Sequence, residues 1–201
     1  MLRTLRLAGG AAVLLAASTI LAQAPPAPPG SDLFPLKQKS KWVYKVADQE
    51  VVVEVNGTEK IGTDEFTKVE TKVGGALKAT ELFQIKSDGV YRVKVKEDKV
   101  EPPVKILALP PTKDATWKID SKVGSQSVKG EFKIKDVKEP VTVPAGKFDA
   151  VVVDGPDFDI AGNKTSIKQW FVPGKGIVKL VFSIQGSTES VLELKEYTEG
   201  K

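Results

Sequence analysis

The residues best suited to hold a metal ion are three aspartates in the stretch DGPDFDIAGN, namely Asp154, Asp157 and Asp159. Carboxylate oxygens are the ligands that Ca²⁺ prefers in proteins. An EF-hand loop beginning at Asp157 would have Ala161 at its third ligand position and Lys168 where the bidentate glutamate belongs. Aspartates are also common in turns. The stretch therefore supports two interpretations, a calcium site and a solvated loop, and the departures from the EF-hand pattern favour the loop.

Aromatic side chains that could contact a ligand fall in segments that we expect to be strands. They are Trp42, Tyr44, Trp117 and Trp170. A domain without disulfides needs the large apolar area of such side chains in its core. A platform for sugars would instead expose two or three of them on one face. We expect most of them to fill the core and keep ligand contact as the alternative.

The stretch PPVKILALPP places Ile106, Leu107 and Leu109 between two proline pairs. Proline cannot donate to a β-ladder, so neither end of this stretch can join a central strand. The pattern predicts an edge strand or a crossover that packs on the core. The alternative is a lip over an apolar cavity that holds lipid or another hydrophobic ligand.

Several kinds of catalysis are excluded by composition. The sequence has no histidine and no cysteine, and its single methionine is Met1. Ser-His-Asp and Cys-His catalysis are therefore excluded, as are zinc, copper and haem sites with their usual ligands. Two carboxylates about 5 to 10 Å apart could still hydrolyse glycosides, but no such pair can be recognised. We expect no cofactor and no catalytic residues.

Two proline-glycine corners resemble binding loops only superficially. Val143 to Gly146 reads V-P-A-G, which suits a type I turn between two strands. Pro173-Gly174 predicts a type II turn with a positive φ at the glycine. Phosphate-binding loops need several glycines that lead into a helix N-terminus. A β-branched segment follows the first corner, so we interpret both as bends.

The N-terminus has the pattern of a secretory signal peptide. Arg3 and Arg6 precede an uncharged stretch that is too short for a membrane span. Cleavage after Ala22 is favoured over Ala24, because Pro25 would follow the second bond. We expect a signal at 1–22, a proline-rich linker at 23–33 and one domain at 34–201. An uncleaved anchor is the alternative.

The charge pattern gives little support to a polyanionic partner. The formal net charge is +4 and falls by two if Arg3 and Arg6 leave with the signal. Lysines and carboxylates alternate along the whole chain, whereas nucleic-acid-binding domains gather basic residues on one face. We expect no nucleic-acid partner and no membrane span after signal removal. An exported chain without cysteine must rely on its apolar core.

Alternation of apolar and polar residues predicts strands through nearly all of the sequence after residue 40. Val90 to Lys96, for example, alternates β-branched and charged residues, which predicts Arg92, Lys94 and Lys96 on a solvated face. Asn56-Gly57 and other glycine-containing pairs predict turns between strands. The predicted fold is all-β and mainly antiparallel: a barrel, a half-barrel or a two-sheet sandwich.

An internal repeat is visible at low similarity. FPLKQKSKW, residues 34–42, and LPPTKDATW, residues 109–117, share an apolar residue, a proline and a tryptophan seven positions after it. The repeat continues with Phe66 matching Phe148, the segment that starts at Phe83 matching the one that starts at Trp170, and Gly89 matching Gly176. This pattern predicts two related meander halves, with chance similarity among short strands as the alternative.

A family resemblance follows from the same motifs. V-x-V-P-A-G-x-F-D-x-V-x-V, W-F-x-P-G-x-G-x-V-K and an N-terminal F-P-L-x(5)-W-x-Y resemble an uncharacterised family of exported bacterial β-proteins, from about Phe34 to Tyr197. The resemblance implies a single curled antiparallel domain and carries over no catalytic residues. A typical member has a glycine shortly before the first tryptophan, where this chain has Gln38-Lys39-Ser40.

The functional expectation is an exported, non-catalytic β domain in the periplasm or outside the cell. It would bind a ligand such as lipid or glycan, or a protein partner of the envelope. Two alternatives remain open at this stage, a carboxylate-dependent enzyme acting on polysaccharide or cell-wall material and a structural envelope component.

Overall fold

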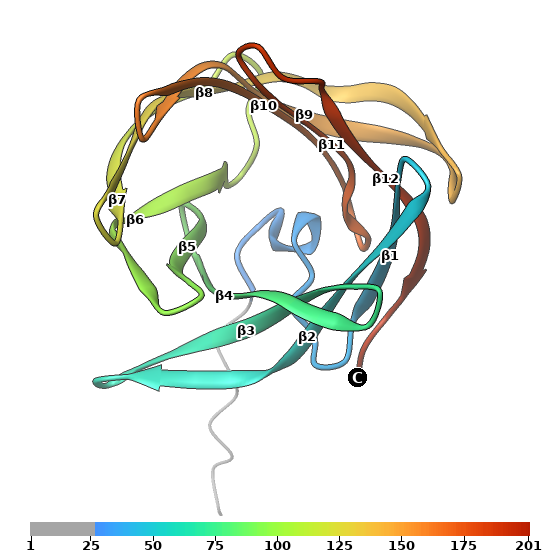
Figure 1. Ribbon diagram of the computed structural model, residues 1–201. Coiled ribbons are helices and arrows are strands. Elements are labelled where there is room, and N and C mark those ends of the chain that lie inside the picture. Colours follow the sequence, from blue (N-terminus) through green and yellow to red (C-terminus); the bar gives the residue numbers. More distant parts are fainter. Residues whose placement is uncertain (1–26) are drawn as a thin grey trace, which may run out of the picture.

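The computed structural model describes residues 27–201, which form a closed antiparallel β-barrel (Figure 1). Each strand pairs with its neighbours in sequence, and β1 pairs with β12 to close the ring. The strands are β1 (Lys41–Val46), β2 (Gln49–Ile61), β3 (Asp64–Val73), β4 (Ala76–Lys86), β5 (Gly89–Val95), β6 (Asp98–Ala108), β7 (Thr116–Val123), β8 (Gln126–Val143), β9 (Gly146–Ile160), β10 (Asn163–Val172), β11 (Gly176–Ile184) and β12 (Ser190–Thr198).

Closure of the ring decides among the three predicted architectures. The all-β prediction is confirmed, and the barrel is the form adopted. Lys41 pairs with Thr198 and Lys45 with Glu193, so the first and last strands meet along nearly their whole length. Closing the sheet removes the free edges that an open sheet would present to other chains.

The predicted corners are turns, but one predicted turn is wrong. Pro144 and Ala145 connect β8 to β9, and Gly174 has a φ of 70° between β10 and β11, as a type II turn requires. Asn56-Gly57 instead lies inside β2, where the ladder to β3 shifts register. Gly57 has a φ of 97° there. A β-bulge can use a glycine with a positive φ, as a hairpin turn does. This shared requirement is why Asn56-Gly57 was predicted to be a turn.

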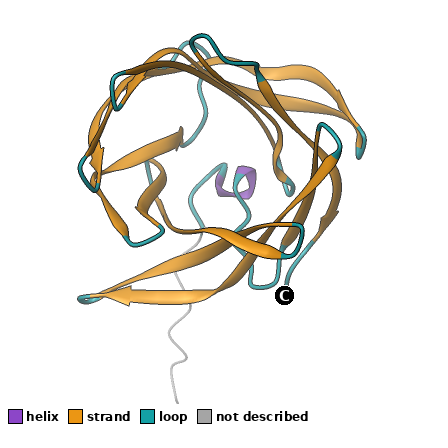
Figure 2. Cartoon of the chain, viewed as in Figure 1, coloured by secondary structure: helices purple, strands orange, loops and turns teal. Residues whose placement is uncertain are grey.

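The N-terminal segment closes one end of the barrel, and we call this the closed end. Its short helix η1 (Ser31–Leu33) lies within the ring of strands (Figure 2). The amide of Gly174 donates to the carbonyl of Asp32 at 2.9 Å, and Leu33 is buried in the core. Ser31–Leu33 thus pack against the barrel directly before residue 34, where we expect the domain to begin. The signal prediction and residues 23–26 of the linker lie outside the described residues.

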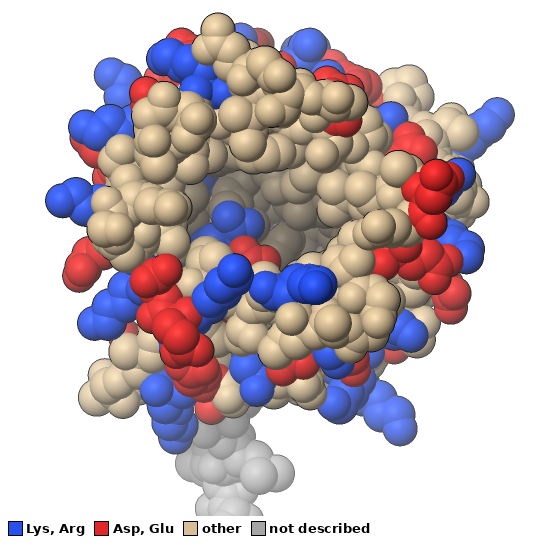
Figure 3. Space-filling model, in the orientation of Figure 1, with Lys and Arg blue, Asp and Glu red and all other residues tan. Residues whose placement is uncertain are grey.

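The opposite end is formed by six hairpin turns, and we call it the mouth. These turns connect β1 to β2, β3 to β4, β5 to β6, β7 to β8, β9 to β10 and β11 to β12. In the space-filling view the molecule is hollowed at its centre, and charged atoms are visible inside the hollow (Figure 3). The barrel interior is thus not completely filled by side chains.

Large aromatic rings fill the part of the interior next to β7, β8 and β9. The rings of Phe132 and Phe158 are 4.6 Å apart, and that of Trp117 is 5.7 Å from Phe132. Gly130 and Gly155 make room for them, because a Cβ at either position would come within 2.6 Å of the Phe158 ring. The hollow is therefore displaced toward the other strands.

The wall has a seam between β6 and β7, where only two residue pairs form a ladder. The pairing stops at the prolines that follow Glu101, as expected for residues that cannot donate. Two side chains bridge the seam beyond that point. Ser121 Oγ donates to the carbonyl of Pro102 at 2.6 Å, and Trp117 Nε1 donates to the carbonyl of Lys105 at 2.8 Å.

The matched residues of the internal repeat occupy equivalent places six strands apart. Trp42 is the second residue of β1, and Trp117 is the second residue of β7. Phe66 is the third residue of β3, and Phe148 is the third residue of β9. Gly89 and Gly176 open β5 and β11. These positions support the interpretation of two six-strand halves. Among residues 27–201, no helix is long and apolar enough to cross a membrane.

Candidate ligand-binding cavity

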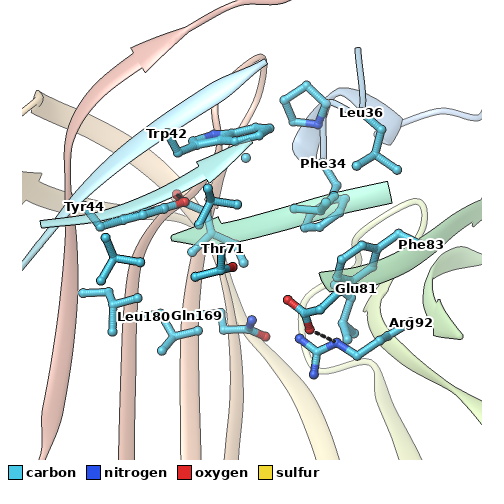
Figure 4. Close-up of a pocket in the computed structure, with 18 residues that line it drawn as sticks. Phe34, Leu36, Trp42, Tyr44, Thr71, Glu81, Phe83, Arg92, Gln169 and Leu180 are labelled. Atoms are coloured by element: carbon cyan, nitrogen blue, oxygen red, sulfur yellow. Dashed lines mark hydrogen bonds and ion pairs between the residues drawn. The ribbon is translucent and has the colours of Figure 1, made fainter. Parts of the chain in front are cut away.

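A cavity of about 180 Å³ lies inside the barrel, between the closed end and its middle (Figure 4). Most of its lining residues are apolar. They are Phe34, Pro35, Leu36, Trp42, Tyr44, Val51, Val53, Val69, Phe83, Ile106, Gly176, Ile177, Leu180 and Leu192, together with Thr71, Glu81, Arg92 and Gln169. An enclosed apolar surface with a few polar groups is the usual composition of a small-molecule site.

The N-terminal segment forms the apolar base of this cavity. Phe34 packs against Phe83 with ring centroids 5.1 Å apart and against Phe171 at 6.5 Å. Leu36 follows on the same segment and also lines the space. A stretch that precedes the first strand thus supplies part of the site.

Trp42 and Tyr44 connect β1 to the turn between β10 and β11 and to the start of β11. Trp42 Nε1 donates to the carbonyl of Lys175 at 2.6 Å, and the Tyr44 hydroxyl donates to the carbonyl of Ile177 at 2.7 Å. Burial raises the pKa of the Tyr44 hydroxyl well above its ordinary value, because the phenolate would lose its hydration. Tyr44 is therefore neutral, and both aromatic rings are fixed by hydrogen bonds while they line the cavity.

Glu81 and Arg92 form an ion pair on the cavity wall. Arg92 Nε lies 2.9 Å from Glu81 Oε1, and the Arg92 guanidinium lies 5.6 Å from the centre of the Phe83 ring. The pair is not aligned as a hydrogen bond at Nε, so this buried nitrogen has no hydrogen-bond acceptor among the described residues. The site carries charges of both signs that neutralise each other.

Gln169 approaches the cavity from β10, on the wall opposite to β4 and β5. Its side chain is nearly fully buried, and its Oε1 has no hydrogen-bond donor among the described residues. In the close-up, the Gln169 amide and the Glu81–Arg92 pair point into the same region (Figure 4). Neither Gln169 Oε1 nor Arg92 Nε is open to the cavity, because both atoms are buried.

The position of Arg92 corrects the prediction of a solvated face. Alternation placed Arg92 and Lys94 on the same outer face, but β5 has one extra residue between them in its ladder with β4, where Phe83 pairs with Arg92 and Leu82 with Lys94. Arg92 consequently points inward, whereas Lys94 pairs on the outside with Glu59 at 3.0 Å. A bulge inserts one residue, and one residue of shift moves a side chain to the opposite face.

The structure brings together three of the seven residues proposed for ligand binding. Trp42, Tyr44 and Ile106 line the cavity. Leu107 and Leu109 are buried in the core and do not line it. The proline-bounded stretch is thus mostly packing, with one residue facing the hollow.

The other two tryptophans have different surroundings. Trp117 packs on Phe132 at the seam. Trp170 lies on the opposite face of β10 from Gln169, where its Nε1 donates to Glu139 Oε1 at 3.0 Å. Lys168 Nζ stands 4.6 Å from the centre of the Trp170 ring and helps to cover it. Neither ring lines the cavity.

The three aspartates are not gathered into a metal site. No group of three or more acidic side chains that could hold a metal ion occurs among residues 27–201. Asp157 lies 3.4 Å from Lys164, and Asp159 Oδ1 accepts a hydrogen bond from the amide of Gly162 at 2.9 Å. Asp154 pairs across strands with residues of β8 and β10, on the outside of the barrel. These contacts are those of a solvated hairpin.

The cavity-lining residues that sequence reasoning missed include Phe34, Leu36, Glu81, Arg92 and Gln169. Phe34 and Leu36 belong to the F-P-L motif, which was interpreted only as an entry to the first strand. Gln169 precedes Trp170 in a mostly apolar strand. A polar residue in such a strand is unusual, because a buried polar group needs a hydrogen-bond partner, and this signal in the sequence points to Gln169. The bulge that turns Arg92 inward leaves no comparable signal in the sequence.

No protein-family model matches this sequence, and no curated protein is significantly similar to it. Two solved structures are similar in fold. A candidate lipoprotein from Parabacteroides distasonis shares 13% identity over 83% of this chain and 98% of its own, with a TM-score of 0.55. A candidate exported protein with a YmcC-like fold from Bacteroides fragilis shares 13% identity over 86% of this chain and 98% of its own, with a TM-score of 0.50. At this identity the likeness shows that the chain shares the fold of these two structures.

Proposed function

We propose that this chain is an exported, non-catalytic barrel that binds a small apolar ligand, or the apolar end of a larger one, in its interior cavity. The observation that carries the proposal is the interior space of about 180 Å³ lined mainly by apolar side chains. An apolar cavity of about 150 Å³ in a protein interior can bind benzene. The cavity is therefore large enough for one ring or a short alkyl chain.

The burial of the aromatic residues favours an apolar ligand over a glycan. Trp42 and Tyr44 are each 6% exposed, and Trp170 is 8% exposed. Stacking on a sugar requires an accessible ring face, which these residues do not offer. A lipid-like ligand requires a concave apolar surface, which the cavity provides.

The two alternative functions receive less support from the geometry. Glu81 is the one carboxylate among the described residues that line the cavity, and it is paired with Arg92. Glycoside hydrolysis needs two carboxyl groups across the scissile bond. A structural component would be expected to present a large apolar patch, whereas the exposed large hydrophobic residues Leu77, Val137 and Ile184 lie on three separate strands.

Export is supported by the N-terminal sequence pattern and by the similarity in fold to a candidate lipoprotein and a candidate exported protein. N-terminal sequencing of protein purified from its own host tests this part. The expected sequence begins at Gln23, after cleavage at Ala22. A mature chain that retains Met1 in a soluble cellular fraction would contradict export.

Binding is tested with toluene as an apolar probe. We expect saturating toluene to raise the Tm of the wild-type protein, because a ligand that binds only the folded state stabilises it. Val53→Phe should abolish this rise, since Val53 lines the cavity and a larger side chain would fill it. Val52→Phe is the matched control, because Val52 is the next residue of β2 and does not line the cavity.

Two results would contradict ligand binding in the barrel. One is an unchanged Tm together with unchanged NMR resonances of the lining residues when toluene is added. The other is an equal rise in Tm for wild type and Val53→Phe. Native mass spectrometry of protein from its own host can then identify the natural ligand directly.

A further inference from the structure

We propose that the ligand is a long-chain amphiphile, whose alkyl chain runs the length of the barrel and whose head group stays in water at the mouth. This inference rests on the proposed function and names the class of its ligand. It concerns the space between the cavity and the mouth, whose walls are formed by residues that do not line the cavity itself.

The apolar inner wall continues from the cavity toward the mouth. Leu180 lines the cavity, and Phe182 is two residues nearer to the mouth on β11. Tyr44 and Val46 stand in the same relation on β1. Alternate residues of a regular strand point to the same side, and the ladders to β10 and β2 are continuous at these positions. Alternation and pairing with lining residues place six apolar residues on this wall: Val46, Val73, Val95, Ile167, Phe182 and Ile184.

This part of the interior is open at the mouth and closed at the other end. Five of the six side chains are half-buried, and Ile184 is 37% exposed, although all of them face the inside of the barrel. At the closed end, Leu33 and Phe83 are only 2% and 3% exposed. Inward-facing apolar residues that remain exposed border an unfilled space, and the molecule is hollowed at its centre (Figure 3). Exposed apolar surface of this kind is typical of a ligand-binding site.

The depth of the hollow matches a long alkyl chain. Ile177 lines the cavity near the closed end, and Ile184 lies seven residues further along β11, at the mouth. At about 3.3 Å per residue and a usual strand tilt of about 40°, this is roughly 18 Å along the barrel axis. An extended alkyl chain advances by about 1.25 Å per carbon, so about fourteen carbons span the hollow. The cavity alone holds about six, as in benzene.

The charges in and around the hollow place the head group at the mouth. A charge that is removed from water is strongly disfavoured, and inside the barrel Glu81 and Arg92 already neutralise each other. The turns of the mouth carry exposed residues of both signs, such as Asp48, Lys96 and Glu97. A head group of either sign can therefore stay hydrated at the mouth while its alkyl chain enters first.

The test is a chain-length series of alkyltrimethylammonium bromides with six to sixteen carbons, titrated by calorimetry below their micelle concentrations. We expect the Kd to fall by up to about fourfold for each added methylene, because each one is buried, and to level off near about fourteen carbons. Decanoate should bind within about threefold of decyltrimethylammonium, since a hydrated head group contributes little to the affinity.

A variant pair locates the alkyl chain above the cavity. Phe182→Gln should weaken the binding of dodecyltrimethylammonium about tenfold, because it removes an apolar side chain from the path of the alkyl chain. The rise in Tm with toluene should persist, since Phe182 does not line the cavity. Val181→Gln is the matched control, because Val181 is the preceding residue of β11, is also half-buried and points to the opposite face. It should keep the wild-type Kd.

The outcomes separate this inference from the function on which it rests. If toluene and the whole series fail to bind, the proposed function fails and this inference fails with it. If toluene binds but the Kd levels off at about six carbons, the ligand occupies only the cavity, so this inference is wrong while the function stands. Equal effects of Phe182→Gln and Val181→Gln on dodecyltrimethylammonium binding would also overturn it.

Discussion

Gly155 shows how one missing side chain shapes the barrel interior. A Cβ at this position would lie 2.4 Å from Cε2 of Phe158 and 2.9 Å from the Phe132 ring. Both rings are almost fully buried and pack against each other. The glycine is therefore required by its neighbours, and the filled side of the barrel depends on it.

We predict that Gly155→Ala lowers the free energy of unfolding by about 1–3 kcal/mol, the usual cost of overpacking a core. Urea denaturation measures the change. The matched second variant is Gly155→Ala combined with Phe158→Leu, in which the smaller side chain makes room for the methyl group. The double variant should be less destabilised than the sum of the two single variants. Simple additivity would show that the Phe158 contact is not the cause.

At the scale of elements, the seam between β6 and β7 is the part of the wall with the fewest ladder hydrogen bonds. Only Val100 and Glu101 pair with β7. Ser121 is 4% exposed and its hydroxyl satisfies the Pro102 carbonyl. Side-chain hydrogen bonds replace the ladder where proline interrupts it.

We predict that Ser121→Ala lowers the free energy of unfolding by about 0.5–1.5 kcal/mol, because it removes the hydrogen bond from the buried Ser121 hydroxyl to the Pro102 carbonyl. Hydrogen exchange should also accelerate in β6 and β7 more than in β2 and β3. Ser183→Ala is the control, since it removes a partly buried hydroxyl that bonds Ser166 in a continuous part of the sheet. Equal effects of the two variants on exchange at the seam would contradict its weakness.

Much of the fold could be predicted because its elements carry local signals. Alternating residues predicted the strands, and Pro173-Gly174 predicted a turn that the structure contains. Closure could not be predicted, because the contact between β1 and β12 depends on the summed twist and tilt of all the strands. The alternation rule also fails at bulges, and the bulge of β5 in its ladder with β4 is why Arg92 was predicted on the wrong face.

The candidate site was only partly predictable for the same reason. Trp42, Tyr44 and Ile106 were proposed as ligand contacts and do line the cavity. Trp117 and Trp170 were proposed on equal grounds, but their rings have other partners. Residue type alone does not predict which face of a strand lines the cavity and which face lies on the outside of the barrel.

At the scale of the whole molecule, stability is distributed over an apolar interior and many surface ion pairs, and no histidine is present. The pKa of Asp88 is lowered from 3.8 because Lys105 and Tyr91 donate hydrogen bonds to its carboxylate. The pKa of Asp114 is lowered in the same way by Lys133. These groups connect strands or turns that are distant in sequence.

The pH dependence of stability follows from the direction of these shifts. A carboxylate with a lower pKa in the folded chain than in the unfolded chain stabilises the fold above its unfolded pKa. That stabilisation is lost as the pH falls through the folded pKa. We therefore predict that the free energy of unfolding is nearly constant between about pH 5.5 and 7 and declines below about pH 4, where Asp and Glu become protonated.

Urea denaturation at a series of pH values measures this profile. Asp88→Asn should make the acid decline shallower, because the variant no longer has the carboxylate whose pKa is shifted. Asp48→Asn is the control, because Asp48 lies in the β1–β2 turn and forms no ion pair among the described residues. In this variant the free energy of unfolding should decline at acid pH as steeply as in the wild type. Histidine is the side chain that ordinarily titrates near neutrality, and this chain has none. A clear step in stability between about pH 6 and 7 would therefore contradict the prediction, because it would require an acid or a lysine with a strongly shifted pKa.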